Sequence, residues 1–241
     1  MLQGKKLICF DLDGTLIDSV GIWNQVDAAL ILELANVIEH EIEIQHERDR
    51  QLKIFHHLPD PYLAYCSFLM QKYAFPLSAE AVKARRYQIS REFLDHAVQP
   101  KAYVRELIQL LKQHGLLLAL TTTTSLFNIE RYQQYNANVN SAIDFTHDFD
   151  LILTRGNVKH IKPHPEIYLT AMQHFQLQPE ECLIVEDSLI GIEAAVFAGI
   201  DAVAIYDEYS AAEQEQIQSK ARFYVQNFIE FSNLAKLGPP T

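Results

Sequence analysis

The sequence predicts an α/β fold, with a doubly wound parallel-sheet core and a separate helical insertion. Two features of the sequence indicate this class. From about residue 98 onwards, short apolar segments of strand type alternate with helical segments, as in a parallel sheet covered by helices on both faces. Directly after the first strand, residues 19–97 contain helical patterns and no strand signal. We therefore expect a core formed by residues 1–18 and 94–241, and a small all-helical domain at residues 19–93.

The expected elements follow from local patterns. The first strand is the apolar run at residues 7–10, and apolar spacing over residues 23–44 predicts one amphipathic helix or two with a break. Pro61 suits the first turn of a helix through residue 73, and Ser78 suits the cap of a helix that reaches about residue 94. Core helices are expected at 103–114, 126–135, 165–175 and 189–198. The remaining strands are expected at 116–120, 149–154, 182–185 and 202–205, the last of which completes the sheet.

The composition is that of a globular protein and excludes several kinds of partner. Of the 241 residues, 49% are hydrophobic and 21% are charged, and the formal net charge is −11. Such a charge does not attract nucleic acid or anionic lipid, so we expect neither as a partner. Cys9, Cys66 and Cys182 have unrelated spacings, which indicates buried thiols in a reducing compartment. No apolar run has the pattern of a signal peptide or a membrane span. We therefore expect a cytoplasmic protein, either a monomer or a homodimer.

Polar side chains follow three of the expected strands. Two acids follow the first strand, a threonine follows the second, and an acid pair follows the strand at 182–185: Asp11, Asp13, Thr121, Glu186 and Asp187. Lys162 lies between the last two of these strands, in a turn with Pro163 and Pro165. Because the carboxyl ends of parallel strands meet at the same edge of a sheet, we expect all these groups to converge.

The expected group of side chains is suited to phosphoryl transfer. Neighbouring carboxylates repel one another unless a cation lies among them, and a few oxygen ligands completed by water suit Mg²⁺. A hydroxyl and an ammonium group are instead suited to binding phosphoryl oxygen atoms. Carboxylates, a metal ion, Thr121 and Lys162 around one point therefore indicate a phosphoryl-transfer site. For Thr121 a simpler explanation stays open, because four consecutive threonines also suit the end of a strand.

These stretches resemble a known family. Four segments are similar, in order and spacing, to the four motifs of the haloacid dehalogenase-like (HAD) hydrolase superfamily: Asp11-Leu12-Asp13-Gly14-Thr15, Thr121 after an apolar strand, Lys162-Pro163, and Val185-Glu186-Asp187-Ser188. The runs from Lys162 to Tyr168 and from Val185 to Gly199 resemble the branch that contains β-phosphoglucomutase and phosphoglycolate phosphatase. The resemblance implies a Rossmann-like core and a helical cap domain inserted after the first strand.

The resemblance also implies a role for each residue of the site. Asp11 would be the nucleophile that forms an aspartyl-phosphate, and Asp13 would be the general acid and base. Four residues would form the metal site: Asp11, Asp13 (through its backbone carbonyl), Glu186 and Asp187. Three groups would bind the phosphoryl group: Thr121, the Thr122 amide and Lys162. A carboxylate at position 13 favours phosphate esters, because dehalogenases and phosphonate hydrolases of the superfamily lack it.

We therefore expect a Mg²⁺-dependent phosphatase that hydrolyses a small phosphorylated metabolite, a phosphate monoester, beneath a closing cap. One alternative is a hexose-phosphate mutase similar to β-phosphoglucomutase. Another is a non-catalytic protein that binds phosphate esters. The cap loop around residues 55–60 has no glycine-arginine signature of the sugar-phosphate mutase, which argues against the first alternative.

The cap itself offers little to which chemistry can be assigned. Its arginines are expected mostly on solvated helix faces: Arg48, Arg50, Arg85, Arg86 and Arg91. Trp23 follows the Asp18-Ser19 junction and is either a buried core residue or a residue that lines a cleft. The sequence does not identify the substrate.

Overall fold

The computed structural model describes residues 1–55 and 57–237, and it divides the chain into two compact units. The first consists of Met1–Val20 and Val98–Thr241, and the second of Gly21–Ala97. The junctions lie within a few residues of the limits expected from the sequence. The expected limit at residues 93 and 94 falls inside a helix, which ends at His96.

The first unit is built on a six-stranded sheet in which all strands are parallel, in the order β3-β2-β1-β4-β5-β6. The strands are β1 (Leu7–Phe10), β2 (Leu117–Thr121), β3 (Leu151–Leu153), β4 (Cys182–Glu186), β5 (Ala202–Ile205) and β6 (Phe223–Val225). From β1 the chain moves to β2 and β3 on one side, and afterwards to β4, β5 and β6 on the other. The order therefore reverses beside β1, which is where open α/β sheets bind their ligands.

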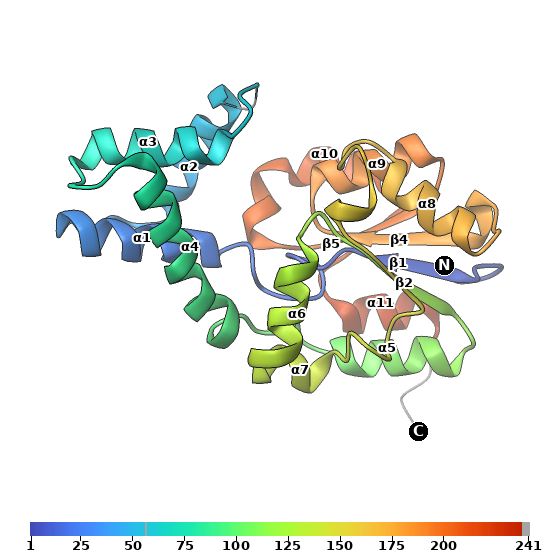
Figure 1. Cartoon of the computed structure of the whole chain (residues 1–241). Coiled ribbons are helices and arrows are strands. Elements are labelled where there is room, and N and C mark those ends of the chain that lie inside the picture. The colour runs from blue at the N-terminus through green and yellow to red at the C-terminus, as the bar shows by residue number, and fades with distance from the viewer. Residues whose placement is uncertain (56, 238–241) are drawn as a thin grey trace. The chain divides into compact units, whose positions relative to one another are not determined.

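Helices cover both faces of this sheet (Figure 1), as the apolar strands require. Helices α8 (Glu166–His174), α9 (Leu189–Ala198) and α10 (Gln214–Lys220) lie over one face, and α5 (Val104–Gln113) and α11 (Phe228–Ala235) lie over the other. The small residues of α9 are buried in a cluster with side chains of the strands. On the opposite face, the rings of Phe10 and Phe228 meet edge to face with their centroids 6.4 Å apart. Helices α6 (Leu126–Tyr135) and α7 (Ala137–Ala142) follow β2.

The second unit consists of helices, with no strand among its described residues. They are α1 (Ile22–Ala35), α2 (Glu41–Phe55), α3 (Pro61–Tyr73) and α4 (Ala79–His96). Both expected starts are confirmed: the Asp60 carboxylate accepts from the Leu63 amide at 2.9 Å before α3, and the Ser78 hydroxyl accepts from the Ala81 amide at 3.3 Å before α4.

The second unit also corrects the expectation for two arginines. Arg48 and Arg86 are buried rather than solvated, because both bind the buried Asp27 carboxylate. Arg86 Nε lies 2.5 Å and Arg48 Nη1 lies 3.4 Å from that carboxylate, and the Tyr65 hydroxyl donates to it at 3.2 Å. The Arg86 guanidinium lies 4.7 Å from the centroid of the half-buried Trp23 ring.

Two differences from the expected core are local. The strand β6 was missed, and the prediction that 202–205 completes the sheet was wrong, because a three-residue strand after a polar helix is too short to show a pattern. The strand expected at 149–154 is confined to Leu151–Leu153. Among the described residues, no helix has both the length and the apolar character to cross a membrane.

Candidate active site

The chain leaves β1 at the carboxyl edge of the sheet and turns at once. The Asp11 amide still donates to the Val185 carbonyl oxygen at 3.0 Å, so the ladder with β4 extends one residue past Phe10. Gly14 then has φ +85°, a conformation that L-residues with side chains rarely adopt. Regular strand geometry therefore does not reach Asp13, and the side chains of Asp11 and Asp13 diverge to different partners.

Lys162 links three parts of the sheet edge. Its ammonium group is buried and donates to Asp11 Oδ1 at 2.6 Å, to Glu186 Oε1 at 2.5 Å and to the Thr121 carbonyl oxygen at 2.8 Å. These three acceptors follow or end β1, β4 and β2, respectively. The lysine lies in the turn before α8, where the Lys162-Pro163 peptide bond is cis. The convergence expected for Asp11, Lys162 and Glu186 is thus present.

Glu186 ends β4 and is held from several sides. Besides Lys162, the Tyr168 hydroxyl donates to Oε1 at 3.0 Å, while Oε2 accepts from the Ser188 hydroxyl at 3.0 Å and the Asp187 amide at 3.1 Å. A side chain at Gly191 would overlap the Glu186 carboxylate. Glycine at this position of α9 is therefore what leaves room for the acid.

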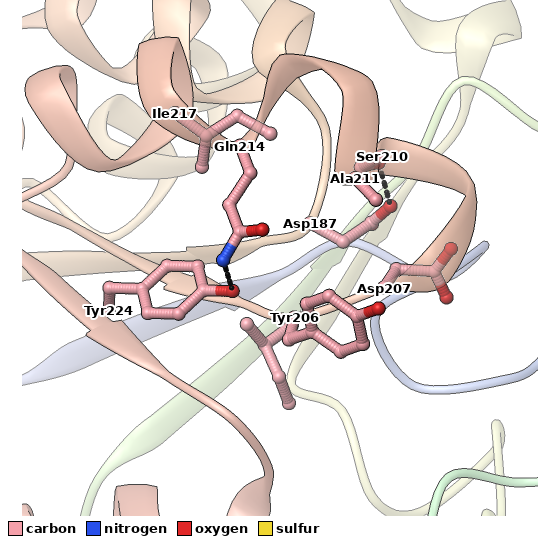
Figure 2. A pocket seen from close by; sticks show the side chains of 9 residues that line it. Asp187, Tyr206, Asp207, Ser210, Ala211, Gln214, Ile217 and Tyr224 are labelled. Carbon is pink, nitrogen blue, oxygen red and sulfur yellow. Dashed lines mark hydrogen bonds between the residues drawn. The ribbon is translucent and has the colours of Figure 1, made fainter.

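Asp187 follows β4 and lies between two hydroxyl groups. Thr15 Oγ1 donates to Asp187 Oδ1 at 2.7 Å, and Ser210 Oγ donates to Oδ2 at 3.4 Å. A Cβ atom on Gly14 would overlap the same carboxylate, so the glycine of the β1 turn also makes room for it. Figure 2 shows Ser210 pointing at Asp187 on the rim of a small pocket. The far side of that pocket is closed by Gln214, whose side-chain amide donates to the Tyr224 hydroxyl at 2.9 Å.

Asp11, Glu186 and Asp187 form a buried acidic group whose ligand atoms lie within 4.8 Å of one another. When ionised, these three carboxylates and the Lys162 ammonium sum to a charge of −2, which a divalent cation balances. A few carboxylate oxygens, completed by water, are the ligands that Mg²⁺ prefers. The Asp13 carboxylate does not join this group, because it accepts from the Ser19 hydroxyl at 2.5 Å. Its proposed metal contact through the backbone carbonyl does not involve that carboxylate.

Burial and neighbouring charges shift the pKa values of the acids and of the lysine in this group. Desolvation raises the pKa of Asp11, Asp13 and Asp187 above the ordinary aspartate value. Desolvation also acts to lower the pKa of Lys162, but the neighbouring carboxylates of Asp11 and Glu186 outweigh it and the pKa is raised. The lysine therefore stays charged, and it does not neutralise all of the acids around it.

The threonines after β2 have hydrogen-bond partners within the sheet. The Thr121 hydroxyl donates to the Phe10 carbonyl oxygen at 3.2 Å, and the Thr122 amide donates to the Leu153 carbonyl oxygen at 3.0 Å. Both donors are therefore engaged within the sheet. The side chain of Thr122, in contrast, lies near Asp13 and acts to lower the pKa of that acid, and its hydroxyl oxygen accepts from the Thr124 amide at 3.0 Å. The direction of this side chain is set by the way the chain leaves β2, and a run of four threonines does not reveal it.

Several residues of the site were not singled out from the sequence. Tyr168 and Ser210 orient Glu186 and Asp187 of the buried acidic group from 18 and 23 residues away in the chain. Ser19 binds the Asp13 carboxylate. Thr15 lies inside the first motif, so its contact with Asp187 could have been sought there. For Tyr168 and Ser210 no local pattern points to the acid that each contacts.

Comparison with known proteins places these residues in a family. The family model described as haloacid dehalogenase-like hydrolase matches residues 8–205. The phosphorylated carbohydrates phosphatase of Thermotoga maritima is 26% identical over 199 residues, which cover 82% of this chain and 83% of the relative. Hexitol phosphatase B of Escherichia coli O157:H7 is 25% identical over 231 residues, 95% of this chain and 92% of the relative. The bifunctional riboflavin kinase/FMN phosphatase of Arabidopsis thaliana is 26% identical over 204 residues, 83% of this chain but only 49% of that protein.

Solved structures share the fold over the whole chain. A candidate β-phosphoglucomutase from Thermotoga maritima has a TM-score of 0.75 at 23% identity, covering 96% of this chain and 98% of its own. CbbY from Rhodobacter sphaeroides, crystallised with xylulose-(1,5)bisphosphate, has a TM-score of 0.68 at 23% identity, covering 97% and 99%. The matched motifs, the sheet and the helices inserted after β1 lead to one conclusion: the chain belongs to the haloacid dehalogenase-like hydrolase family, in the branch with a helical segment after the first strand.

Proposed function

We propose that the protein hydrolyses a small phosphate monoester, such as a phosphorylated sugar or sugar alcohol, in a Mg²⁺-dependent reaction with Asp11 as the nucleophile. The chain is a phosphoric monoester hydrolase of the HAD-like type, and its relatives include phosphatases of phosphorylated carbohydrates and of hexitols. The observation that carries the proposal is the buried Lys162 ammonium, bonded to both Asp11 and Glu186 beside Asp187.

Asp11 would act as the nucleophile. One of its oxygens, Oδ1, is held by Lys162, and the other is free of the lysine for attack on phosphorus. The bond to the leaving alkoxide breaks as the aspartyl-phosphate forms. Lys162 offsets the negative charge that the phosphoryl group brings to a buried acidic site.

The metal site would consist of Asp11, Asp187 and the backbone carbonyl of Asp13, with Glu186 nearby. When bound there, Mg²⁺ supplies positive charge to the phosphoryl oxygens. Thr15 and Ser210 orient the Asp187 carboxylate through their hydroxyl groups.

Asp13 would protonate the leaving oxygen atom and then take a proton from the water that hydrolyses the aspartyl-phosphate. The raised pKa of this buried acid supports the first of these tasks, since it favours the protonated form. Contact with the phosphoryl group would come from Thr121, Thr122 and Lys162. The Thr122 side chain lies near Asp13, while the Thr121 hydroxyl and the Thr122 amide also have acceptors within the sheet.

The test is phosphate release from sugar phosphates, hexitol phosphates, phosphoglycolate, nucleoside monophosphates and an aryl phosphate, with Mg²⁺ or with EDTA. We expect metal-dependent release that Asp11→Asn abolishes. The matched control is Asp201→Asn, which alters an exposed acid before β5, at the opposite edge of the sheet. Phosphate release that survives in the Asp11→Asn variant would overturn the assignment of Asp11 as the nucleophile. Conversion of a hexose 1-phosphate to the 6-phosphate without free phosphate would instead identify a mutase.

A further inference from the structure

A second group of possible metal ligands lies on the surface of the first unit, around the turn that holds Lys162. Among the described residues, two groups of acidic and histidine side chains have ligand atoms within 4.8 Å of one another, and only this one contains nitrogen. It consists of His160, His164 and Glu166. We propose that these three side chains bind a divalent transition-metal ion such as Zn²⁺, separately from the oxygen site of Asp11 and Asp187.

The two imidazoles converge on one carboxylate oxygen. His160 Nδ1 lies 3.0 Å and His164 Nδ1 lies 3.9 Å from Glu166 Oε2, and the ring centroids are 4.6 Å apart. His164 Nδ1 also accepts from the Glu166 backbone amide at 3.3 Å. A metal ion at its usual distances of about 2.0–2.2 Å from nitrogen and oxygen ligands would replace that hydrogen bond. The side chains of His160 and His164 are 63% and 50% exposed, so water can complete the coordination shell.

The carboxylate is already oriented for this role. Glu166 begins α8, and its two oxygens accept from the backbone amides of Lys159 at 2.8 Å and His160 at 3.0 Å. The hydrogen bond from the Lys159 backbone amide is the main cause that keeps the pKa of Glu166 below its ordinary value, so this carboxylate is anionic. Backbone donors that fix a ligating carboxylate are the supports that metal sites in proteins employ.

The donor set selects the class of metal. Two imidazoles and one carboxylate suit Zn²⁺, Co²⁺, Ni²⁺ or Cu²⁺, whereas Mg²⁺ prefers oxygen atoms alone. In the metal-free protein a proton occupies the short contact between His160 Nδ1 and Glu166. Binding of the ion replaces that proton, which passes to the other nitrogen of the ring or to solvent.

The position of the site gives it a structural consequence. Its three ligands stand on both sides of Lys162 and Pro163, within seven residues of the chain. A bound ion therefore closes a small loop around the turn that carries the buried lysine. It does so without touching the ammonium group, which lies inside the sheet edge while the two histidines face solvent.

The test is Zn²⁺ binding to the full chain, measured by calorimetry with Mg²⁺ in large excess. We expect the parent to bind one more equivalent of Zn²⁺ than the double variant His160→Ala/His164→Ala. Loss of a group that only orients a ligand lowers metal affinity by about 10–100-fold. Each single variant, which removes a ligand itself, should therefore lower the affinity for the additional Zn²⁺ ion at least about tenfold. All of these substitutions are at exposed positions, and the oxygen site is the same in every variant.

The matched control is His147→Ala, which removes another exposed histidine bonded to a carboxylate, at 2.9 Å from Asp144. It should bind Zn²⁺ as the parent does. Zn²⁺ should also raise the unfolding temperature of the parent more than that of the double variant, because it binds only the folded site. Equal Zn²⁺ stoichiometry and affinity in the parent and the double variant would overturn the proposal, whatever the enzymatic activity.

Discussion

Gly191→Ala is a substitution for which helix propensity and the geometry of the site predict opposite results. Gly191 is the third residue of α9, where alanine is normally more stable than glycine by about 1 kcal/mol. In this protein, however, a Cβ atom at position 191 would overlap the Glu186 carboxylate. Glu186 cannot simply swing away, because its side chain is buried and bound by Lys162 and Tyr168.

The size of the effect follows from these contacts. Displacing the carboxylate breaks hydrogen bonds to a charged group, each of which contributes about 1.5–3 kcal/mol. Loss of two such bonds costs about 3–6 kcal/mol, and the gain in helix propensity offsets about 1 kcal/mol of this. We therefore expect Gly191→Ala to lower the free energy of unfolding by about 2–5 kcal/mol.

Urea denaturation at fixed pH in EDTA measures this difference. The matched control is Gly156→Ala, whose Cβ would lie 3.5 Å from Thr154 Oγ1, an ordinary contact. A second comparison uses Glu186→Ala as the background, in which the space is vacant and Gly191→Ala should be neutral or stabilising. If Gly191→Ala proves as stable as the parent in the unaltered background, the packing of the glycine against the acid does not matter and the reasoning fails.

Three further predictions concern charge. Lys162→Met should lower the free energy of unfolding by about 3–5 kcal/mol in urea titrations without metal, because it leaves buried carboxylates without their cation; an unchanged midpoint would contradict this. Asp27→Asn should lower the free energy of unfolding by a similar amount, because it leaves the buried Arg86 charge uncompensated. Glu33→Gln breaks an exposed ion pair and should lower the free energy of unfolding by at most about 1 kcal/mol. In EDTA the buried aspartates, whose pKa values are raised in the folded state, bind more protons when folded than when unfolded. Stability measured across a pH series should therefore fall as pH rises from about 4, by up to about 1.4 kcal/mol per pH unit for each group, and Mg²⁺ should flatten that dependence.

Much of the fold could be predicted because the signals are local. The β1 strand ends where its apolar run meets Asp11, and helix α9 begins and ends as expected, because Ser188 caps it and Gly199 closes it with φ +70°. The insertion was recognised from the absence of strand patterns over a long segment. β6 was missed because three residues, Phe223–Val225, are too few to establish a period.

The candidate site, like the fold, was predicted from the sequence only in part. The sequence by itself determined which acids and which lysine occupy the ends of β1 and β4 and the turn before α8, because in a parallel sheet those positions share one edge. It did not determine that Thr122, rather than Thr121, lies beside Asp13, because the two threonines are adjacent and only packing orients them. Nor did it determine that Arg86 is buried, since an amphipathic pattern does not distinguish a buried, paired arginine from an exposed one. These outcomes were decided by the tertiary structure, because a buried polar group must find its partner wherever the fold brings one within hydrogen-bonding distance.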